Sequence, residues 1–220
     1  MERRTLQTKI SHPGAQPFWD RIAPKYAQKP IGDPGAYEEK LAQVGSLLRA
    51  TDRVLEIGCG TGSTALRLAP GVAHITATDA SRAMIEIAQS KLGPADTPAN
   101  VTFHQADSAD LVEGHPFDAI CAFSLLHLIE DVPHVLGRVR EQLKPGGLFI
   151  SKTECLKDRT VLLRAMVPAL VAMGIAPRVT ALSTGDLHRL VRAAGFEIEH
   201  TRHFGAKRTS PFIVARRTAA

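Results

Sequence analysis

One stretch of the chain, Val54–Gly62 (V-L-E-I-G-C-G-T-G), constrains the fold more than any other. Residues Arg53–Ile57 are expected to form a strand, and three glycines follow at alternate positions. Glycine lets the backbone turn tightly and approach a ligand with no Cβ in the way. Open parallel sheets bind ligands outside the carboxyl ends of their strands. The stretch therefore predicts a strand that ends in a ligand-binding turn.

The chain that follows alternates apolar strand patterns with helical ones. Helices are expected to start near Thr64, Ser81, Asp131, Arg159 and Ser183, the last with a capping box completed by Asp186. Strands are expected at Arg53–Ile57, His74–Thr78, Val101–Ala106, Phe117–Phe123, Leu148–Ser151, Phe196–His203 and Pro211–Arg216. Such alternation predicts an α/β fold, a Rossmann-like three-layer sandwich with a mostly parallel sheet. The last two of these strands are expected to form a hairpin at the end of the chain, which is not part of a plain dinucleotide-binding fold.

The length of 220 residues favours one structural domain with added N-terminal segments. Residues 1–16 are expected to be a flexible tail. Residues 17–50 are expected to be a helical cover, with one helix from Pro17 to about Tyr26 and another over Ala36–Leu48. Residues 51–220 are expected to form the sheet-containing domain.

Composition excludes several classes of protein. Hydrophobic residues make up 44% and charged residues 22%, an ordinary globular balance, and no apolar stretch reaches the ~18 residues of a membrane span. Cys59, Cys121 and Cys155 form no C-x-x-C pair, so we expect no metal site and no disulfide framework, but reduced thiols in a cytoplasm. The net charge of +5 is dispersed and aromatics are scarce, so a nucleic-acid partner is not expected.

Two acidic residues strengthen the interpretation of the glycine turn. Asp79 ends the second expected strand about 20 residues after Gly58, where a carboxylate can accept hydrogen bonds from ribose hydroxyls. Asp107 ends the third strand and could accept a hydrogen bond from an adenine amino group. The alternative is that both acids cap the helices that follow them.

A nicotinamide dinucleotide is the competing ligand for such a turn. Its fingerprint requires a third glycine where this chain has Ser63. Glu56 also places negative charge beside the turn, which disfavours a pyrophosphate and suits a ligand that carries an ammonium and a sulfonium group.

Five motifs in order resemble those of the class I S-adenosylmethionine-dependent methyltransferases, in the broad branch that includes the ubiquinone-biosynthesis type. They are Val54–Gly62, Ala77–Ser81 with Met84, Gln105–Ser108, Phe117–Ile129 and Leu143–Gly147, and the resemblance covers about residues 17 to 217. It implies a seven-stranded sheet whose last strand is antiparallel. It also implies an enzyme that uses S-adenosylmethionine as cofactor and releases S-adenosylhomocysteine. The implied cofactor-binding residues are Tyr26, Glu56, Gly58, Cys59, Gly60, Thr61, Gly62, Asp79, Ala80, Met84, Ala106, Asp107, Ser108, Phe123 and Ser124.

The acceptor is less constrained than the cofactor. A hydroxyl or carbon acceptor needs a general base, for which His127 is the candidate; the alternative is that His127 packs at the sheet edge. Trp19 and Tyr26 are expected either to cover the site or to pack their helix onto the domain. Val161–Pro177 has few polar side chains, which leaves open an apolar or lipid-like small-molecule acceptor or a plain packing helix.

Other functions remain open at this point. Amino-base methyltransferases often carry [DNS]-P-P-[YF] where this chain has Phe123–Leu126, so that chemistry is not expected, although RNA remains an alternative substrate. A non-catalytic partner subunit with the same fold is the remaining alternative. A monomer or a homodimer is expected.

Overall fold

The computed structural model describes residues 15–93, 97–206 and 208–219, and in these ranges the chain is built around one seven-stranded sheet. The strand order is β3-β2-β1-β4-β5-β7-β6. Strand β7 pairs antiparallel with both of its neighbours, and the other recorded pairings are parallel. The predicted α/β fold with a seven-stranded sheet and an antiparallel last strand is confirmed.

The strands lie close to where the sequence patterns predict them. They are β1 (Arg53–Ile57), β2 (His74–Asp79), β3 (Val101–Gln105), β4 (Phe117–Phe123), β5 (Leu143–Lys152), β6 (Phe196–Arg202) and β7 (Phe212–Arg217). Strand β4 pairs with β1 and β5 in the middle of the sheet, and its residues 119–122 are all buried. An apolar run of this kind is expected for a strand that is covered on both faces.

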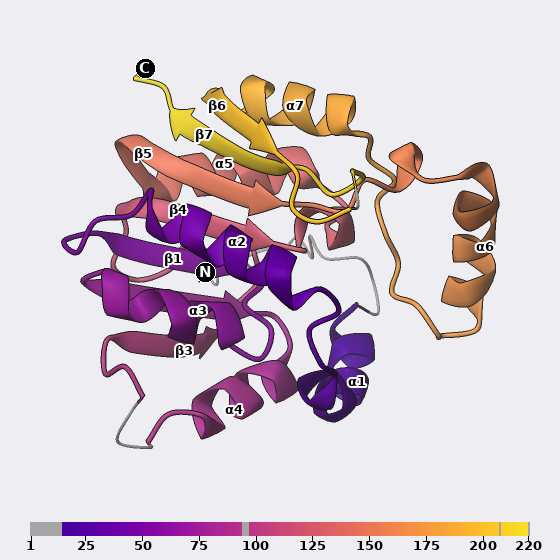
Figure 1. Cartoon of the computed structure of the whole chain (residues 1–220), viewed down its shortest axis with the longest axis horizontal. Coiled ribbons are helices and arrows are strands. Elements are labelled where there is room, and N and C mark those ends of the chain that lie inside the picture. The colour runs from indigo at the N-terminus through magenta and orange to yellow at the C-terminus, as the bar shows by residue number, and fades with distance from the viewer. Residues whose placement is uncertain (1–14, 94–96, 207, 220) are drawn as a thin grey trace, which may run out of the picture.

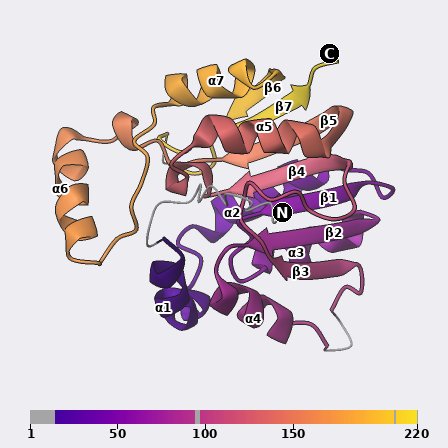
Figure 2. The same ribbon diagram turned by 180° about the vertical axis from the view of Figure 1, so that it is seen from behind.

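Helices cover both faces of the sheet, as Figures 1 and 2 show. The helices α2 (Pro34–Gly45), α3 (Ser63–Leu68) and α4 (Arg82–Ser90) pack their apolar side chains on one face, with Val44, Ala65 and Ile85 in one core cluster. The helices α5 (Val132–Gln142) and α7 (Thr184–Ala193) contribute Leu136 and Leu187 to a second cluster on the opposite face. The result is the expected three-layer sandwich.

Three predicted helix starts are confirmed. The side chains of Ser81, Asp131 and Ser183 accept hydrogen bonds from the first-turn amides of α4, α5 and α7. The capping box of α7 is complete, because the Asp186 carboxylate also accepts from the Ser183 backbone N–H. These caps satisfy amides that have no partner inside their helix.

Several predicted boundaries are wrong, and α2, for example, spans Pro34–Gly45 instead of Ala36–Leu48. Helix α1 spans Ala15–Gln28, so it begins two residues before Pro17; a proline in the first turn removes an N–H that the helix would not use. The rest of the expected N-terminal tail, residues 1–14, lies outside the described residues. Helix α5 ends at Gln142, and Pro145–Gly147 lies within β5 instead of closing the helix, because buried Leu143 already pairs with Phe117 of β4.

Two helices lie beyond the carboxyl ends of the parallel strands (Figures 1 and 2). Helix α1 contacts α4, while α6 (Val161–Ala172) stands away from the sandwich and contributes no buried residue. Short 3₁₀ turns at Ala69–Gly71, Leu126–Leu128 and Leu156–Asp158 complete the connections. Over the described residues, no helix is long and apolar enough to cross a membrane.

Gly62→Ala tests whether the glycine turn tolerates a Cβ at residue 62. Gly62 has φ +76°, and an added Cβ would lie 2.6 Å from Phe103 Cζ. We expect a loss of about 2–5 kcal/mol in the free energy of unfolding, from left-handed backbone strain of about 1–2 kcal/mol and overpacking of about 1–3 kcal/mol. Urea denaturation measures this loss. Gly32→Ala is the control, because no atom lies within 4 Å of its added Cβ, and an equal effect of both substitutions would contradict the argument.

Candidate functional site

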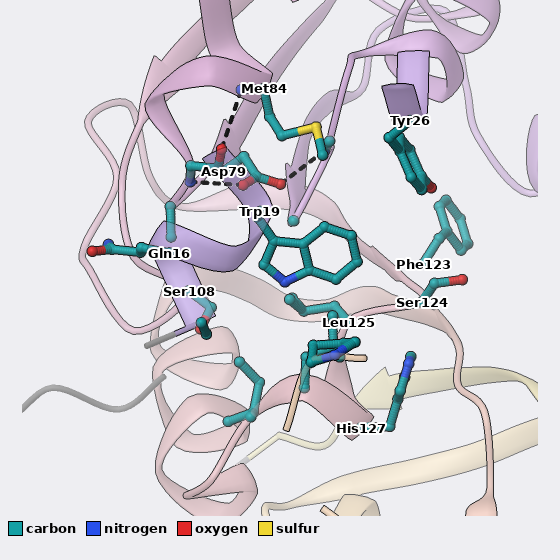
Figure 3. A pocket seen from close by; sticks show the side chains of 18 of the residues that line it. Gln16, Trp19, Tyr26, Asp79, Met84, Ser108, Phe123, Ser124, Leu125 and His127 are labelled. Atoms are coloured by element: carbon teal, nitrogen blue, oxygen red, sulfur yellow. Dashed lines mark hydrogen bonds between the residues drawn. The ribbon is translucent and has the colours of Figure 1, made fainter. Parts of the chain in front are cut away.

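A cavity opens where the carboxyl ends of β1, β2 and β4 meet α1. Figure 3 shows the side chains that surround it. Its walls combine apolar side chains with a few polar ones; the lining residues are Ala15, Gln16, Trp19, Tyr26, Gly58, Gly60, Asp79, Ala80, Ser81, Met84, Ala106, Ser108, Phe123, Ser124, Leu125, His127, Leu128, Ile129 and Pro177. An enclosed apolar site with a few convergent polar groups is the usual form of a small-molecule binding site.

The glycine turn forms one wall with bare backbone. Gly58 has φ +69°, and a Cβ there would lie 2.8 Å from Leu125 Cδ1. Gly60 has φ +54°, and a Cβ there would meet no atom within 4 Å, because the residue faces the open cavity. The turn therefore presents a surface that a ligand can approach to backbone distance. This geometry fits the cofactor that the sequence motifs imply.

Asp79 lies opposite this turn at the end of β2. Its Oδ2 accepts a hydrogen bond from the Gly60 N–H at 2.9 Å, and its Oδ1 accepts from the Ser81 N–H at 2.9 Å. Burial raises the pKa of the Asp79 carboxyl, and the two backbone hydrogen bonds oppose that shift. Each carboxylate oxygen retains further acceptor capacity, which suits a pair of ribose hydroxyls.

Helix α1 is attached to the rim of the cavity by Asp20. Its Oδ1 accepts from the Ser81 hydroxyl at 2.6 Å and from the Ala83 N–H at 3.2 Å, at the N-terminus of α4. A carboxylate is favoured there by the unpaired amides and the positive end of the helix dipole. On the same helix, Trp19 and Tyr26 line the cavity with their rings in an edge-on contact, 6.0 Å between centroids.

A buried charged pair lies behind the cavity wall. The Lys40 ammonium of α2 is 4.2 Å from the ring centroid of Phe123 and 4.6 Å from that of Tyr37. Burial lowers the pKa of Lys40 and raises the pKa of Glu56, and the attraction between the two groups opposes both shifts. Oε2 of Glu56 has no hydrogen-bond partner among the described residues. Phe123 lines the cavity, so the Lys40 ammonium lies against a ring of the cavity wall.

The segment after β4 brings a strained residue and an imidazole to the cavity. Ser124 is the one residue other than glycine in the described ranges with positive φ, at 54°. His127 lines the cavity, and its Nδ1 is buried without a hydrogen-bond partner among the described residues. Burial lowers the pKa of His127, and the negative charge of Glu154 partly opposes this. At neutral pH the ring is therefore uncharged and can accept a proton.

Most of the residues expected to bind a cofactor or act as a base meet at this cavity. Those that line it are Tyr26, Gly58, Gly60, Asp79, Ala80, Met84, Ala106, Ser108, Phe123, Ser124 and His127. The remaining expected residues, Glu56, Cys59, Thr61, Gly62 and Asp107, do not line it.

The alternative that the two acids cap helices is wrong for both positions. Ser81, not Asp79, is the N-cap of α4. No helix follows Asp107 before β4, since residues 106–116 form turns. The Asp107 carboxylate accepts hydrogen bonds from the Ala109 N–H at 3.1 Å and the Ser108 hydroxyl at 3.4 Å within such a turn.

Sequence reasoning missed several contributors. The burial of Lys40 could not be predicted, because a lysine in a helical pattern is normally exposed. Asp20 lacks a local pattern, since its partners lie more than 60 residues away. The cavity-lining role of Leu125, Leu128 and Ile129 could have been suspected from their position after the fourth strand.

Comparison with known proteins identifies the family. The chain matches the methyltransferase domain family over residues 28–201. It is 36% identical over 102 residues to 27-O-demethylrifamycin SV methyltransferase of Amycolatopsis mediterranei, covering 46% of this chain and 38% of that protein. It is 29% identical over 155 residues to ubiquinone biosynthesis O-methyltransferase of Xylella fastidiosa, covering 67% of this chain and 61% of that protein. The matches thus span less than two thirds of these relatives.

A solved structure agrees with this match at the level of the fold. Magnesium protoporphyrin IX methyltransferase of Synechocystis, solved with bound S-adenosylhomocysteine, superposes with a TM-score of 0.67 at 19% identity, covering 93% of this chain and 96% of that one. The chain therefore belongs to the methyltransferase domain family, in the S-adenosylmethionine-dependent class that its motifs resemble.

Asp20→Ala tests whether the attachment of α1 shapes the cavity. Loss of two hydrogen bonds at the α4 N-terminus is expected to lower the free energy of unfolding by about 1 kcal/mol. It is also expected to weaken S-adenosylhomocysteine binding, because Trp19 and Tyr26 are carried on α1. Calorimetric titration and urea denaturation give the two quantities.

Asp33→Ala is the matched control for this experiment. The Asp33 carboxylate accepts from the Ala36 N–H at 3.0 Å and caps α2, outside the cavity lining. It should cost similar stability and leave affinity unchanged. Equal affinities of the two variants would show that the Asp20 contacts do not shape the site.

Proposed function

We propose that this protein transfers a methyl group from S-adenosylmethionine to a hydroxyl of a small molecule, with His127 as the general base. The observation that carries the proposal is the meeting of three features in one cavity: the bare glycine turn, the Asp79 carboxylate and the buried neutral imidazole.

The three cysteines in the described residues are buried and free, which supports a place in the cytoplasm.

The proposed cofactor contacts follow from the geometry. The Asp79 carboxylate accepts the ribose hydroxyls, and Gly58 and Gly60 admit the ligand to backbone distance. Met84, Ala106 and Ser108 line the adenine side, while Asp107 holds the turn that presents Ser108. Cys59, Thr61 and Gly62 belong to the turn and Glu56 precedes it, and none of the four lines the cavity. The bound cofactor supplies an activated methyl group, so the protein has to orient the acceptor and exclude water.

His127 is placed to remove the proton from the acceptor hydroxyl. The imidazole lines the cavity with one nitrogen unpaired in the described structure, and burial keeps it neutral near pH 7. The His127 backbone is fixed, because the Thr180 N–H donates to its carbonyl oxygen at 2.8 Å. A neutral, positioned imidazole is the most common general base in enzymes.

Apolar side chains on the acceptor side favour a largely apolar small molecule. Trp19 and Leu125 line the cavity together with His127 (Figure 3). Leu128 and Ile129 also line it. The two relatives above are named as methyltransferases of a rifamycin precursor and of ubiquinone biosynthesis, and the second is named an O-methyltransferase. These names agree with a hydroxylated apolar acceptor.

RNA is a less suitable acceptor than a small apolar molecule. Arg216 donates to Glu199 and to the Gly146 carbonyl, and Arg217 donates to the Leu143 carbonyl. Both arginines lie near the amino end of β5, at the edge of the sheet opposite the cavity. The C-terminal basic pair is thus engaged in structural contacts remote from the proposed site.

Asp79→Ala tests the cofactor site. We expect wild-type protein to bind S-adenosylhomocysteine and not NAD. The variant should lose about 10- to 100-fold in affinity, since hydrogen bonds to a charged group contribute about 1.5–3 kcal/mol. Asp118→Ala is the matched control: that carboxylate pairs with Lys144 at 2.6 Å at the amino end of β4, so affinity should not change. Binding of NAD, or equal loss in both variants, would contradict the proposal.

His127→Gln tests the base. The rate constant kcat for a phenolic acceptor identified by screening should fall about 10²- to 10⁴-fold, while the affinity for S-adenosylhomocysteine stays unchanged. In the wild type, kcat should rise with pH with a midpoint below the ordinary histidine pKa of about 6.5, because the required form is neutral and burial lowers the pKa of His127. The variant should lose this rise. A variant with full kcat would assign His127 a packing role.

A further inference from the structure

Helix α6 and the residues that follow it expose apolar side chains that a folded protein normally covers. No residue of α6 is buried, and Val161 and Leu162 are 76% and 73% exposed. We call the following set the α6 patch: Val161, Leu162, Leu163, Met166, Met173 and Ile175. A helix that is apolar on all sides is normally found inside a core or in contact with lipid.

The charges around the α6 patch are mostly positive. From Arg159 to Gly185 the chain has no acidic residue, while it carries Arg159, Arg164 and Arg178. Arg159 pairs with Glu154, whereas Arg164 and Arg178 are exposed and line one open groove with apolar residues of α6. Glu130 is the one carboxylate that lines the same groove. The patch is therefore an apolar surface flanked by cations.

These features select among the candidate occupants of the patch. A contact between the patches of two copies would bring together Arg164 and Arg178 of each chain with one Glu130 carboxylate per groove, so positive charge would remain in excess. An anionic lipid surface fits both the charge and the apolar side chains of the patch. Its headgroups neutralise arginines, and its acyl boundary accepts apolar side chains. Helix α6 has 12 residues, against about 20 for a span, so the contact would be superficial.

The α6 patch is connected to the mouth of the cavity. The Arg21 guanidinium of α1 donates to the Gly174 carbonyl at 2.7 Å, just after α6. Pro177 lines the cavity itself. Both α1 and α6 lie beyond the carboxyl ends of the parallel strands (Figure 1). A surface bound to the patch would thus lie beside the entrance of the cavity.

We propose that the α6 patch docks this protein peripherally on an anionic lipid surface. The apolar side chains of the patch enter the headgroup boundary, and Arg164 and Arg178 contact lipid phosphates. The proposal rests on exposure and charge and is independent of the reaction that the cavity carries out.

Co-sedimentation of the full chain with vesicles tests this proposal. One set of vesicles is phosphatidylcholine alone, and the other contains about one third phosphatidylglycerol. We expect binding to the anionic set, weakened by added salt. Leu162→Gln with Ile175→Gln should reduce binding more than 10-fold. Arg164→Gln with Arg178→Gln should reduce it about five-fold per arginine.

Control substitutions separate the α6 patch from general surface effects. Leu111 is 50% exposed on another part of the molecule, so Leu111→Gln should leave vesicle binding unchanged. Thermal unfolding and S-adenosylhomocysteine binding should be unchanged in all variants, which keeps this test separate from that of the cavity. Equal binding to neutral vesicles, no binding to either set, or a dimer in gel filtration that Leu162→Gln with Ile175→Gln dissociates would overturn the proposal.

Discussion

The Asp79 carboxylate connects the glycine turn, the end of β2 and the start of α4. It accepts from Gly60 in the glycine turn and from Ser81 at the start of α4, while its own backbone ends β2. Ser81 in turn caps α4 and donates to Asp20 of α1. Helix α1 is thus connected, through Asp20 and Ser81, to the carboxylate at the end of β2.

A side chain of α2 also contacts the wall of the cavity. The Lys40 ammonium lies against Phe123, and the negative charge of Glu56 partly opposes the effect of burial on the pKa of Lys40. Positive φ at Ser124 places backbone strain on the side that faces the cavity, whereas Gly58 and Gly60 adopt positive φ without that cost.

The sequence contained most of the fold and much of the site, because both depend on local patterns. The glycine turn, the Ser81 and Ser183 caps and the apolar run of β4 each occupy a few consecutive residues, so spacing alone located them. The contacts that sequence could not reveal join distant segments. Asp20 reaches across to Ser81, and Lys40 reaches Phe123 through the packing of α2, which no local pattern encodes. The boundary between α5 and β5 was misplaced because Pro145–Gly147 resembles a helix stop, whereas pairing with β4 sets the start of β5.

The strand order has a consequence for biosynthesis. Strand β7 is the last to leave the ribosome, yet it lies between β5 and β6 in the sheet. Until residues 212–217 emerge, the edges of β5 and β6 offer unpaired backbone groups to any other chain nearby. A sheet formed before that point would lack the strand that joins β5 to β6. Pairing of β7 with both neighbours removes these exposed edges.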